Sequence, residues 1–280
     1  MKKTIIAIIY DFDKTLCDRD MQEYAFIPNL GLTPEEFWEE TDNLAQEHKM
    51  DKILACMYMM KEKSNQLGHS LKRKDFVKLG EYIKFYPGIT EWFDRINNYG
   101  KSIGIKVEHY IVSSGLKEII EGTEISKYFK EIYACEFLYN KENEAIWPAM
   151  SVNYTTKTQF LSRINKGVLD ISDDITLNAK MLDEERRIST KNMIYVGDGF
   201  TDIPSMTMVR QNNGYAIAVY QKNKLETVKS LLKEDRVDYA VLADYRENSD
   251  MDILTKEILV EMKINTELRE KHKRQLKEFE

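Results

Sequence analysis

The sequence predicts an α/β protein: a doubly wound parallel sheet with an inserted, mainly helical unit. Short apolar segments typical of buried strands alternate with helical patterns along most of the chain, and this alternation favours a parallel sheet with right-handed crossovers. Residues 18–86 break the alternation, because they show helical apolar spacing without a convincing strand. A chain of 280 residues is long enough for one large domain, or for a core with a second unit inserted into it.

The first predicted strand is an isoleucine-rich run that ends in two carboxylates, Asp11 and Asp13. Side chains alternate along a strand and its extension, so we expect both acids on one side and Phe12 on the other. The carboxyl end of a central strand is where open α/β sheets bind ligands. Neighbouring like charges raise each other's proton affinity unless a cation holds them. The pattern therefore indicates a metal site that contains a nucleophile.

The predicted cap is the helical stretch that follows the first strand. Thr33-Pro34-Glu35-Glu36 is a strong helix start, because it combines a hydroxyl cap, a proline at the first helical position and acids in the first turn. Residues 85–88, Phe-Tyr-Pro-Gly, indicate a turn back into the main unit. We therefore expect a core formed by residues 1–17 and 87–280, with a cap formed by residues 18–86.

Five later segments complete the predicted sheet. They are residues 109–112, 131–135, 192–196, 215–220 and 239–243, and helical patterns such as 116–122 and 158–165 lie between them. Residues 137–156 are expected to form a hairpin or an irregular loop. The tail from Asp252 onward is expected to be a charged amphipathic helix that packs on the domain, because its apolar spacing is too irregular for a coiled coil.

Composition excludes some classes of function. A net charge of −6 with 31% charged residues argues against non-specific nucleic-acid binding. No stretch approaches the roughly 20 apolar residues that a membrane helix needs. The three cysteines lie far apart and form no CxxC pair, which is typical of reduced thiols. We therefore expect a cytoplasmic protein with neither a nucleic-acid nor a membrane partner.

Further polar candidates follow later strand segments or begin a helix. They are Ser113, Ser114, Lys157, Asp198 and Asp202. Gly115 is expected to open a helix whose backbone amides receive an oxyanion. Taken singly, a Ser-Ser-Gly sequence is usually a helix cap and a lone lysine is usually a surface residue. Together, in this order and at one edge of a parallel sheet, they favour a shared site.

These residues carry a resemblance to a known family. Asp-Phe-Asp-Lys-Thr-Leu at 11–16, Ile-Val-Ser-Ser-Gly at 111–115, Lys157 and Gly-Asp-Gly-Phe-Thr-Asp at 197–202 resemble the four ordered motifs of the haloacid dehalogenase superfamily. The pattern is most similar to the phosphoserine-phosphatase-like branch, which has a helical cap of the C1 type between the first two motifs. The resemblance spans roughly Thr4 to Val219 and implies a Rossmann-like core, but it does not identify a substrate.

The resemblance implies a mechanism that agrees with the acids at the strand ends. It makes Asp11 a nucleophile that forms an aspartyl-phosphate, and Asp13 the general acid and then the general base. It implies Mg²⁺ held by Asp11, the backbone carbonyl of Asp13, and Asp198, with Asp202 as a supporting or alternative carboxylate. The implied activity is hydrolysis of a small phosphomonoester.

Phosphate binding is implied for a second group of residues. Ser113, the amide beside Ser114, and Lys157 are expected to hold the phosphoryl oxygens, and Lys157 also offsets the repulsion between an anion and an aspartate. Thr15 belongs with this group and is expected to orient the loop or the general acid.

The substrate and some alternatives stay open at the level of sequence. Asp20 lies where phosphoserine phosphatases place an acid that meets the substrate amine, although a solvated residue or a helix cap explains it as well. Arg73 is a candidate for the substrate carboxylate on composition alone. A phosphomutase or phosphotransferase, or a non-catalytic Mg²⁺-binding regulatory module, remains an alternative. The partner is expected to be a small phosphorylated metabolite, and the oligomeric state is left open.

Overall fold

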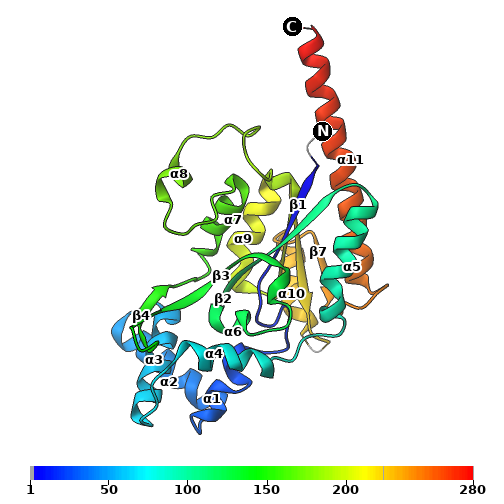
Figure 1. The fold of residues 1–280 in the computed structure, drawn as a ribbon. Coiled ribbons are helices and arrows are strands. Elements are labelled where there is room, and N and C mark those ends of the chain that lie inside the picture. Colours follow the sequence, from blue (N-terminus) through cyan, green and yellow to red (C-terminus); the bar gives the residue numbers. More distant parts are fainter. Residues whose placement is uncertain (1–2, 223, 280) are drawn as a thin grey trace.

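The computed structural model describes residues 3–222 and 224–279. Within these residues, seven strands form one sheet in the order β4-β3-β2-β1-β5-β6-β7 (Figure 1). Neighbouring strands from β3 to β7 are parallel, and β4 alone is antiparallel to its neighbour. The strands are β1 (Ile5–Tyr10), β2 (Lys106–Leu116), β3 (Phe129–Tyr139), β4 (Ala145–Met150), β5 (Met193–Gly197), β6 (Tyr215–Tyr220) and β7 (Tyr239–Leu242). The predicted α/β fold with its parallel sheet is confirmed.

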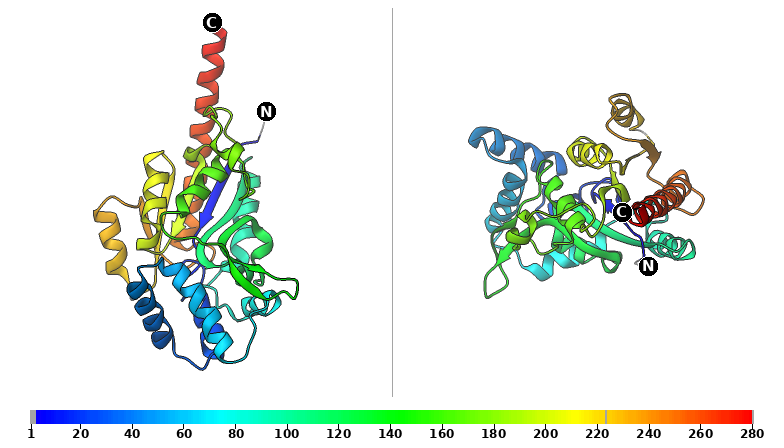
Figure 2. Two further views of the ribbon diagram at one scale, coloured as in Figure 1. Left: turned by 90° about the vertical axis from the view of Figure 1, so that its left-hand side faces the viewer. Right: turned by 90° about the horizontal axis from the view of Figure 1, so that it is seen from above.

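Helices cover both faces of the sheet. Helices α5 (Ile89–Ser102) and α11 (Asp250–Phe279) lie on one face, and α7 (Lys157–Lys166) and α9 (Ile203–Gln211) lie on the other, while α10 (Leu225–Lys233) packs on β6 and β7 (Figures 1 and 2). Because β1 is central and covered on both sides, residues 6–10 are fully buried. The described residues of this part of the chain also form short helices, which are α6 (Lys117–Glu121), η3 (Ser126–Tyr128), α8 (Asp174–Asn178), η4 (Thr190–Asn192) and η5 (Phe200–Asp202).

Residues 18–86 contribute helices at the carboxyl end of the sheet (Figure 1). They are η1 (Met21–Glu23), α1 (Phe26–Asn29), α2 (Pro34–His48), α3 (Lys52–Gln66), α4 (Arg73–Leu79) and η2 (Gly80–Tyr82). The predicted start of α2 is confirmed as a capping box, in which Thr33 and Glu36 each accept a hydrogen bond from the other's backbone. The chain enters and leaves this segment side by side, because Cys17 and Phe85 form an antiparallel bridge.

The expected helix at Gly115 is wrong. Strand β2 continues through Ser113, Ser114 and Gly115 to Leu116, and α6 begins at Lys117 with only five residues. The strand is irregular here, because its register against β3 shifts between Val112 and Leu116. Met21 packs directly on this stretch, and its Sδ accepts a hydrogen bond from the Leu116 amide at 3.0 Å.

Of the two alternatives for residues 137–156, the structure has the hairpin. Strands β3 and β4 pair through this segment. The hairpin reaches α3, where Lys61 Nζ donates to the Ile146 carbonyl at 2.8 Å. The excursion therefore braces the helical segment against the sheet.

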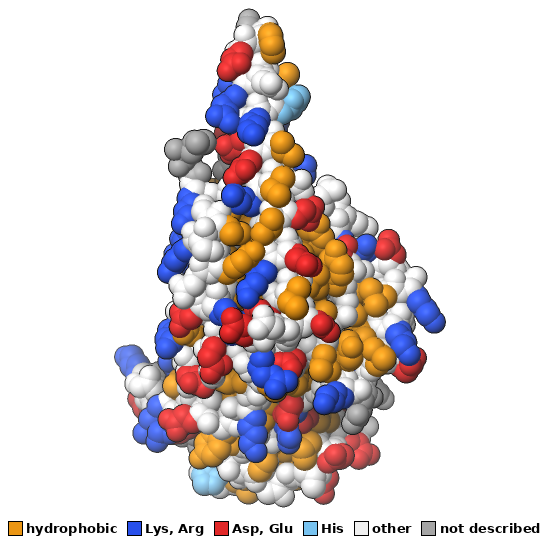
Figure 3. Space-filling model, turned by 90° about the vertical axis from the view of Figure 1, so that its right-hand side faces the viewer, with side chains coloured by type: hydrophobic (Ala, Val, Ile, Leu, Met, Phe, Trp, Pro, Cys, Tyr) orange, Lys and Arg blue, Asp and Glu red, His pale blue; other side chains and the backbone are white. Residues whose placement is uncertain are grey.

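The tail packs on the domain over only half its length. Met251, Ile258 and Met262 in the first half of α11 are buried. The second half projects from the body, and apolar side chains continue along its surface (Figures 2 and 3); Leu268 is 56% exposed. Within the described residues no helix, α11 included, is both long enough and apolar enough to cross a membrane.

Candidate active site

Two adjacent strands deliver the acids. Asp11 follows β1 and Asp198 follows β5, and the two strands are held in register where the Asp11 amide donates to the Val196 carbonyl at 2.9 Å. Asp202 ends the short helix η5 (Phe200–Asp202). One carboxylate oxygen from each of Asp11, Asp198 and Asp202 lies within 4.8 Å of the other two. The parallel sheet thus brings together acids that are almost 190 residues apart.

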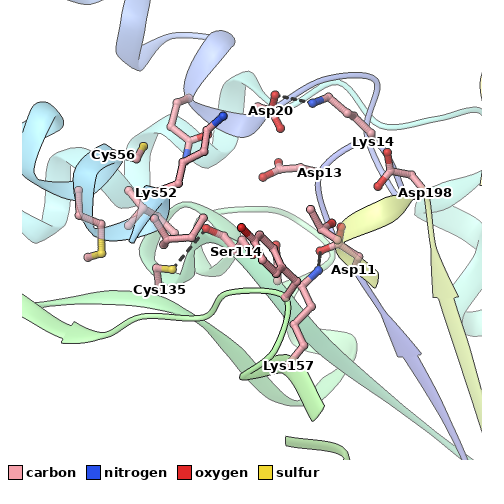
Figure 4. Close-up of a pocket in the computed structure, with 18 of the residues that line it drawn as sticks. Asp11, Asp13, Lys14, Asp20, Lys52, Cys56, Ser114, Cys135, Lys157 and Asp198 are labelled. Atoms are coloured by element: carbon pink, nitrogen blue, oxygen red, sulfur yellow. Dashed lines mark hydrogen bonds and ion pairs between the residues drawn. The ribbon is translucent and has the colours of Figure 1, made fainter. Parts of the chain in front are cut away.

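A buried lysine completes this cluster. Lys157 begins α7, and its Nζ lies 2.9 Å from Asp11 Oδ1 (Figure 4). The same Nζ lies 2.7 Å from Asp202 Oδ1. Burial alone would lower the pKa of Lys157, but the charges of Asp11 and Asp202 raise it above its ordinary value. The lysine therefore stays charged and balances part of the acidic cluster.

Asp202 is held in place by Gly197, the first residue of the motif at 197–202, and by Tyr195, which the sequence did not single out. The Tyr195 hydroxyl donates to Asp202 Oδ1 at 2.7 Å. A Cβ at Gly197 would lie 2.3 Å from Asp202 Oδ2, so only glycine leaves room for this carboxylate. Tyr195 was hidden because an aromatic residue in an apolar strand is typical of a core.

The acids are costly to keep charged together. Burial raises the pKa of Asp11 to about 6, with Asp202 adding to the rise and Lys157 opposing it. Burial, followed by the charges of Asp202 and Asp11, raises the pKa of Asp198 to about 8. Asp202 Oδ2 finds no hydrogen-bond partner among the described residues. A set of hard oxygen ligands that need positive charge fits Mg²⁺.

Asp13 stands apart from the three-acid cluster. Its Oδ1 accepts a hydrogen bond from the Met21 amide at 2.8 Å, which fixes the carboxyl group at the cavity (Figure 4). Burial, followed by the charges of Asp20 and Asp11, raises the pKa of Asp13 well above its ordinary value. This environment favours the protonated form of the carboxyl group, which is the form that a general acid needs. We call Asp11, Asp13, Asp198, Asp202 and Lys157 the acidic floor.

The remaining sequence candidates divide into two groups. Ser113, Ser114 and Asp20 line the cavity together with Asp11, Asp13, Asp198 and Lys157 of the acidic floor, whereas Asp202 is fully buried and is not among the lining residues. The Ser114 hydroxyl is buried without a hydrogen-bond partner in the described residues, whereas Ser113 Oγ accepts from the Gly115 amide at 3.1 Å. Asp20 pairs with Lys14 Nζ at 2.5 Å.

Thr15 and Arg73 are not brought to this cavity. Neither lies among the described residues that line it. Thr15 is buried, and its carbonyl accepts a hydrogen bond from the Tyr245 hydroxyl at 2.8 Å. Arg73 begins α4 and forms an ion pair with Glu121 of α6.

The cavity has a volume of about 580 Å³, and helix α3 forms the side that faces the acidic floor. Ile53, Cys56, Met57 and Met60 supply its lining there, and we call these four residues the α3 wall. The sequence predicts helical apolar spacing in residues 18–86, but such spacing is the same for a helix that lines a cavity and for one that packs in a core.

Comparisons with known proteins agree with this arrangement. A family model described as haloacid dehalogenase-like hydrolase matches residues 8–207. A curated relative from Borreliella burgdorferi, described as an uncharacterized protein, is 26% identical over 271 residues, covering 87% of this chain and 93% of the relative.

Solved structures show the same fold at low sequence identity. A HAD family hydrolase from Salmonella enterica serovar Typhi has a TM-score of 0.57 and 16% identity, over 92% of this chain and 72% of the other. A phosphoserine phosphatase in apo form has a TM-score of 0.55 and 17% identity, over 87% and 97% of the two chains. A phospho-aspartyl intermediate analogue of phosphoserine phosphatase gives 0.53 and 17%, over 91% and 99%.

Proposed function

The chain belongs to the haloacid dehalogenase-like hydrolases, and from this premise we propose that it is a Mg²⁺-dependent phosphatase acting on a small phosphomonoester. The observation that carries the proposal is the convergence of Asp11, Asp198 and Asp202, with Lys157 between two of them, where Asp11, Asp198 and Lys157 line the cavity. An acid beside a buried cation and a proton-bearing carboxyl group is the arrangement that phosphoryl transfer through an aspartate needs.

In the first half of the reaction, an Asp11 carboxylate oxygen attacks the phosphorus. The bond between phosphorus and the leaving oxygen breaks, and Asp13 gives its proton to that oxygen so that an alcohol departs. Lys157 keeps Asp11 ionised and in place, because its ammonium lies 2.9 Å from Asp11 Oδ1. Ser113 and Ser114 line the same end of the cavity, where their polar groups can hold the phosphoryl oxygens.

In the second half, water attacks the phosphorus of the aspartyl-phosphate. Asp13, now ionised, takes a proton from this water, the bond between Asp11 and phosphorus breaks, and inorganic phosphate leaves. Asp11, Asp198 and Asp202 would hold Mg²⁺, with the Asp13 carbonyl as a further ligand. When bound, the ion neutralises charge on the acids and on the phosphoryl group.

We propose the division of the chain into a core of residues 1–17 and 87–280 and a cap of residues 18–86. Two observations support it: the chain enters and leaves the cap through the bridge between Cys17 and Phe85, and α3 contributes one side of the cavity. We also place the protein in the cytoplasm, which agrees with three cysteines that are all free and buried.

Phosphate release from an aryl phosphate tests the proposal. Purified protein is expected to release phosphate with Mg²⁺ and to lose this activity with EDTA, and Asp11→Asn is expected to abolish it. Asp183→Asn is a matched control, because the Asp183 side chain is 96% exposed. Full activity in Asp11→Asn would show that the nucleophile is another group. Transfer of the phosphoryl group to an added alcohol or sugar phosphate, without release, would favour a phosphotransferase or a mutase.

A further inference from the structure

We propose that the substrate carries a predominantly apolar leaving group, alkyl or aryl, which binds against the α3 wall. This inference rests on the proposed phosphatase function, since it assigns the acidic floor to the phosphoryl group. It concerns the other side of the same cavity, which holds the part of the substrate that departs as an alcohol.

The α3 wall presents one continuous apolar face. Its four members lie at positions i, i+3, i+4 and i+7 of the helix, and Leu116 of β2 extends the lining. Met57 and Met60 are 2% and 0% exposed. Unbranched thioether side chains adapt to ligands of different shape, so this wall suits flexible chains as well as rings. The Trp38 ring also lines the cavity, and its indole N–H is already bonded to Glu23.

Among the described residues that line the cavity, no cation is left unpaired for a carboxylate on the leaving group. Among the described lining residues, the basic side chains are lysines, and each has an acidic partner. Lys157 lies between Asp11 and Asp202, and Lys14 pairs with Asp20. Lys52 pairs with Asp42 at 2.6 Å and is 54% exposed. A second anionic group on the substrate would have to displace one of these acids from its lysine.

One polar contact is available to the leaving group. Gln22 lines the cavity and is 5% exposed, and its Oε1 has no hydrogen-bond partner in the described part of the chain. A buried amide oxygen of this kind can accept a hydrogen bond from a hydroxyl or an N–H group. The leaving group is therefore apolar over most of its surface, with room for one donor near Gln22.

A series of n-alkyl phosphates from ethyl to hexyl tests the inference on the Mg²⁺-loaded protein. We expect kcat/KM to rise about fourfold for each added methylene until the wall is covered, since each buried methylene contributes that factor. Phosphoserine and glycerol phosphate are expected to fall at least about tenfold below butyl phosphate. Acetyl phosphate reports the acidic floor separately, because it brings almost no leaving-group surface.

The outcomes separate the two proposals. A flat alkyl series, or a preference for phosphoserine, with turnover of acetyl phosphate intact would overturn the apolar leaving group and leave the phosphatase standing. If neither these esters nor the acyl phosphate acetyl phosphate is hydrolysed, both the phosphatase proposal and this inference are wrong.

Two variants link the preference to the wall. Met57→Gln is expected to lower the ratio of kcat/KM for hexyl over ethyl phosphate about tenfold. Tyr58→Gln is the matched control on the next position, because Tyr58 is 52% exposed and does not line the cavity; its ratio is expected to equal that of the parent. If thermal unfolding shows that Met57→Gln is misfolded, Ile53→Gln at the less buried end of the wall takes its place. Unchanged ratios in folded wall variants would overturn the inference.

Discussion

The acidic floor and the α3 wall face each other across one cavity, yet they are positioned by different means. Asp11 and Asp198 follow two hydrogen-bonded parallel strands, so the backbone of the sheet sets their separation. The α3 wall instead depends on how a whole helix lies over the sheet, with Lys61 bonded to the β3-β4 hairpin. The difference teaches that the groups for chemistry are fixed by local sequence and sheet topology, whereas the groups for specificity are fixed by long-range packing.

The largest effect that would break this comparison is expected at Asp13. With an aryl phosphate, whose leaving group needs little protonation, Asp13→Asn should still form the aspartyl-phosphate but lack the base that activates water. We expect kcat to fall about 10²–10⁴-fold and labelled phosphate to stay covalently bound after an acid quench. Unchanged turnover, or a fall in kcat without trapped phosphate, would show that Asp13 is not this base.

Lys157→Met tests the charge balance of the acidic floor. We expect kcat to fall about 10²–10³-fold, because the phosphoryl group loses a fixed positive charge. The free energy of unfolding should also fall by about 3–5 kcal/mol, because buried acids lose their partner. Phosphate release and urea unfolding measure the two effects.

The control for this lysine is Lys180→Met, at an exposed position, which should leave both quantities unchanged. A folded Lys157→Met protein with the parent's stability and turnover would show that the cluster of acids does not need this cation.

The residues of the acidic floor were largely predictable, because neighbouring residues in the sequence mark their positions. Asp11 directly follows an isoleucine-rich strand, Asp198 lies in a glycine-flanked turn after another, and Lys157 begins a helix, so each position is marked by its immediate neighbours. Strand alternation and parallel pairing then bring them to one edge.

The rest could not be predicted from pattern. The extension of β2 through Gly115 depends on Met21, a residue far away in sequence that packs against the strand. The stripe of Ile53, Cys56 and Met57 predicts an apolar helix face, but periodicity does not say whether that face meets side chains or a cavity. The sequence likewise predicts that Tyr195 is a core residue, and only the structure shows that its hydroxyl lies 2.7 Å from Asp202 Oδ1.

A smaller effect is expected from a change in pH on the free energy of unfolding. This effect arises from the acidic floor and not from the α3 wall, because the wall has no carboxylates. In the metal-free protein the pKa of Asp11 is raised to about 6 and that of Asp198 to about 8, from an ordinary value of 3.8. At a pH between 3.8 and the raised pKa of each acid, the folded protein holds a proton that the unfolded chain has released. The free energy of unfolding should therefore fall as pH rises from about 4 to about 8.

Mg²⁺ takes the place of those protons, so its stabilising effect should grow over the same pH range. Thermal unfolding at several pH values, with EDTA and with Mg²⁺, measures this. Asp198→Asn is expected to remove the part of the pH dependence between about 6 and 8. A Mg²⁺-induced change in Tm that is the same at every pH would contradict the raised pKa values of Asp11 and Asp198.

The smallest effect on stability and activity is expected for a substitution of Arg73, a residue of the proposed cap. Its ion pair with Glu121 is half-exposed, so Arg73→Ala should lower the free energy of unfolding by less than about 1 kcal/mol. Glu121→Ala removes the same pair from the other side and should match it. Because Arg73 does not line the cavity, kcat/KM for alkyl phosphates should stay within about twofold of the parent. A rise in KM in Arg73→Ala alone, confined to phosphoserine, would mean that this arginine reaches a substrate carboxylate in another arrangement of the cap, and the division between a polar floor and an apolar wall would then fail.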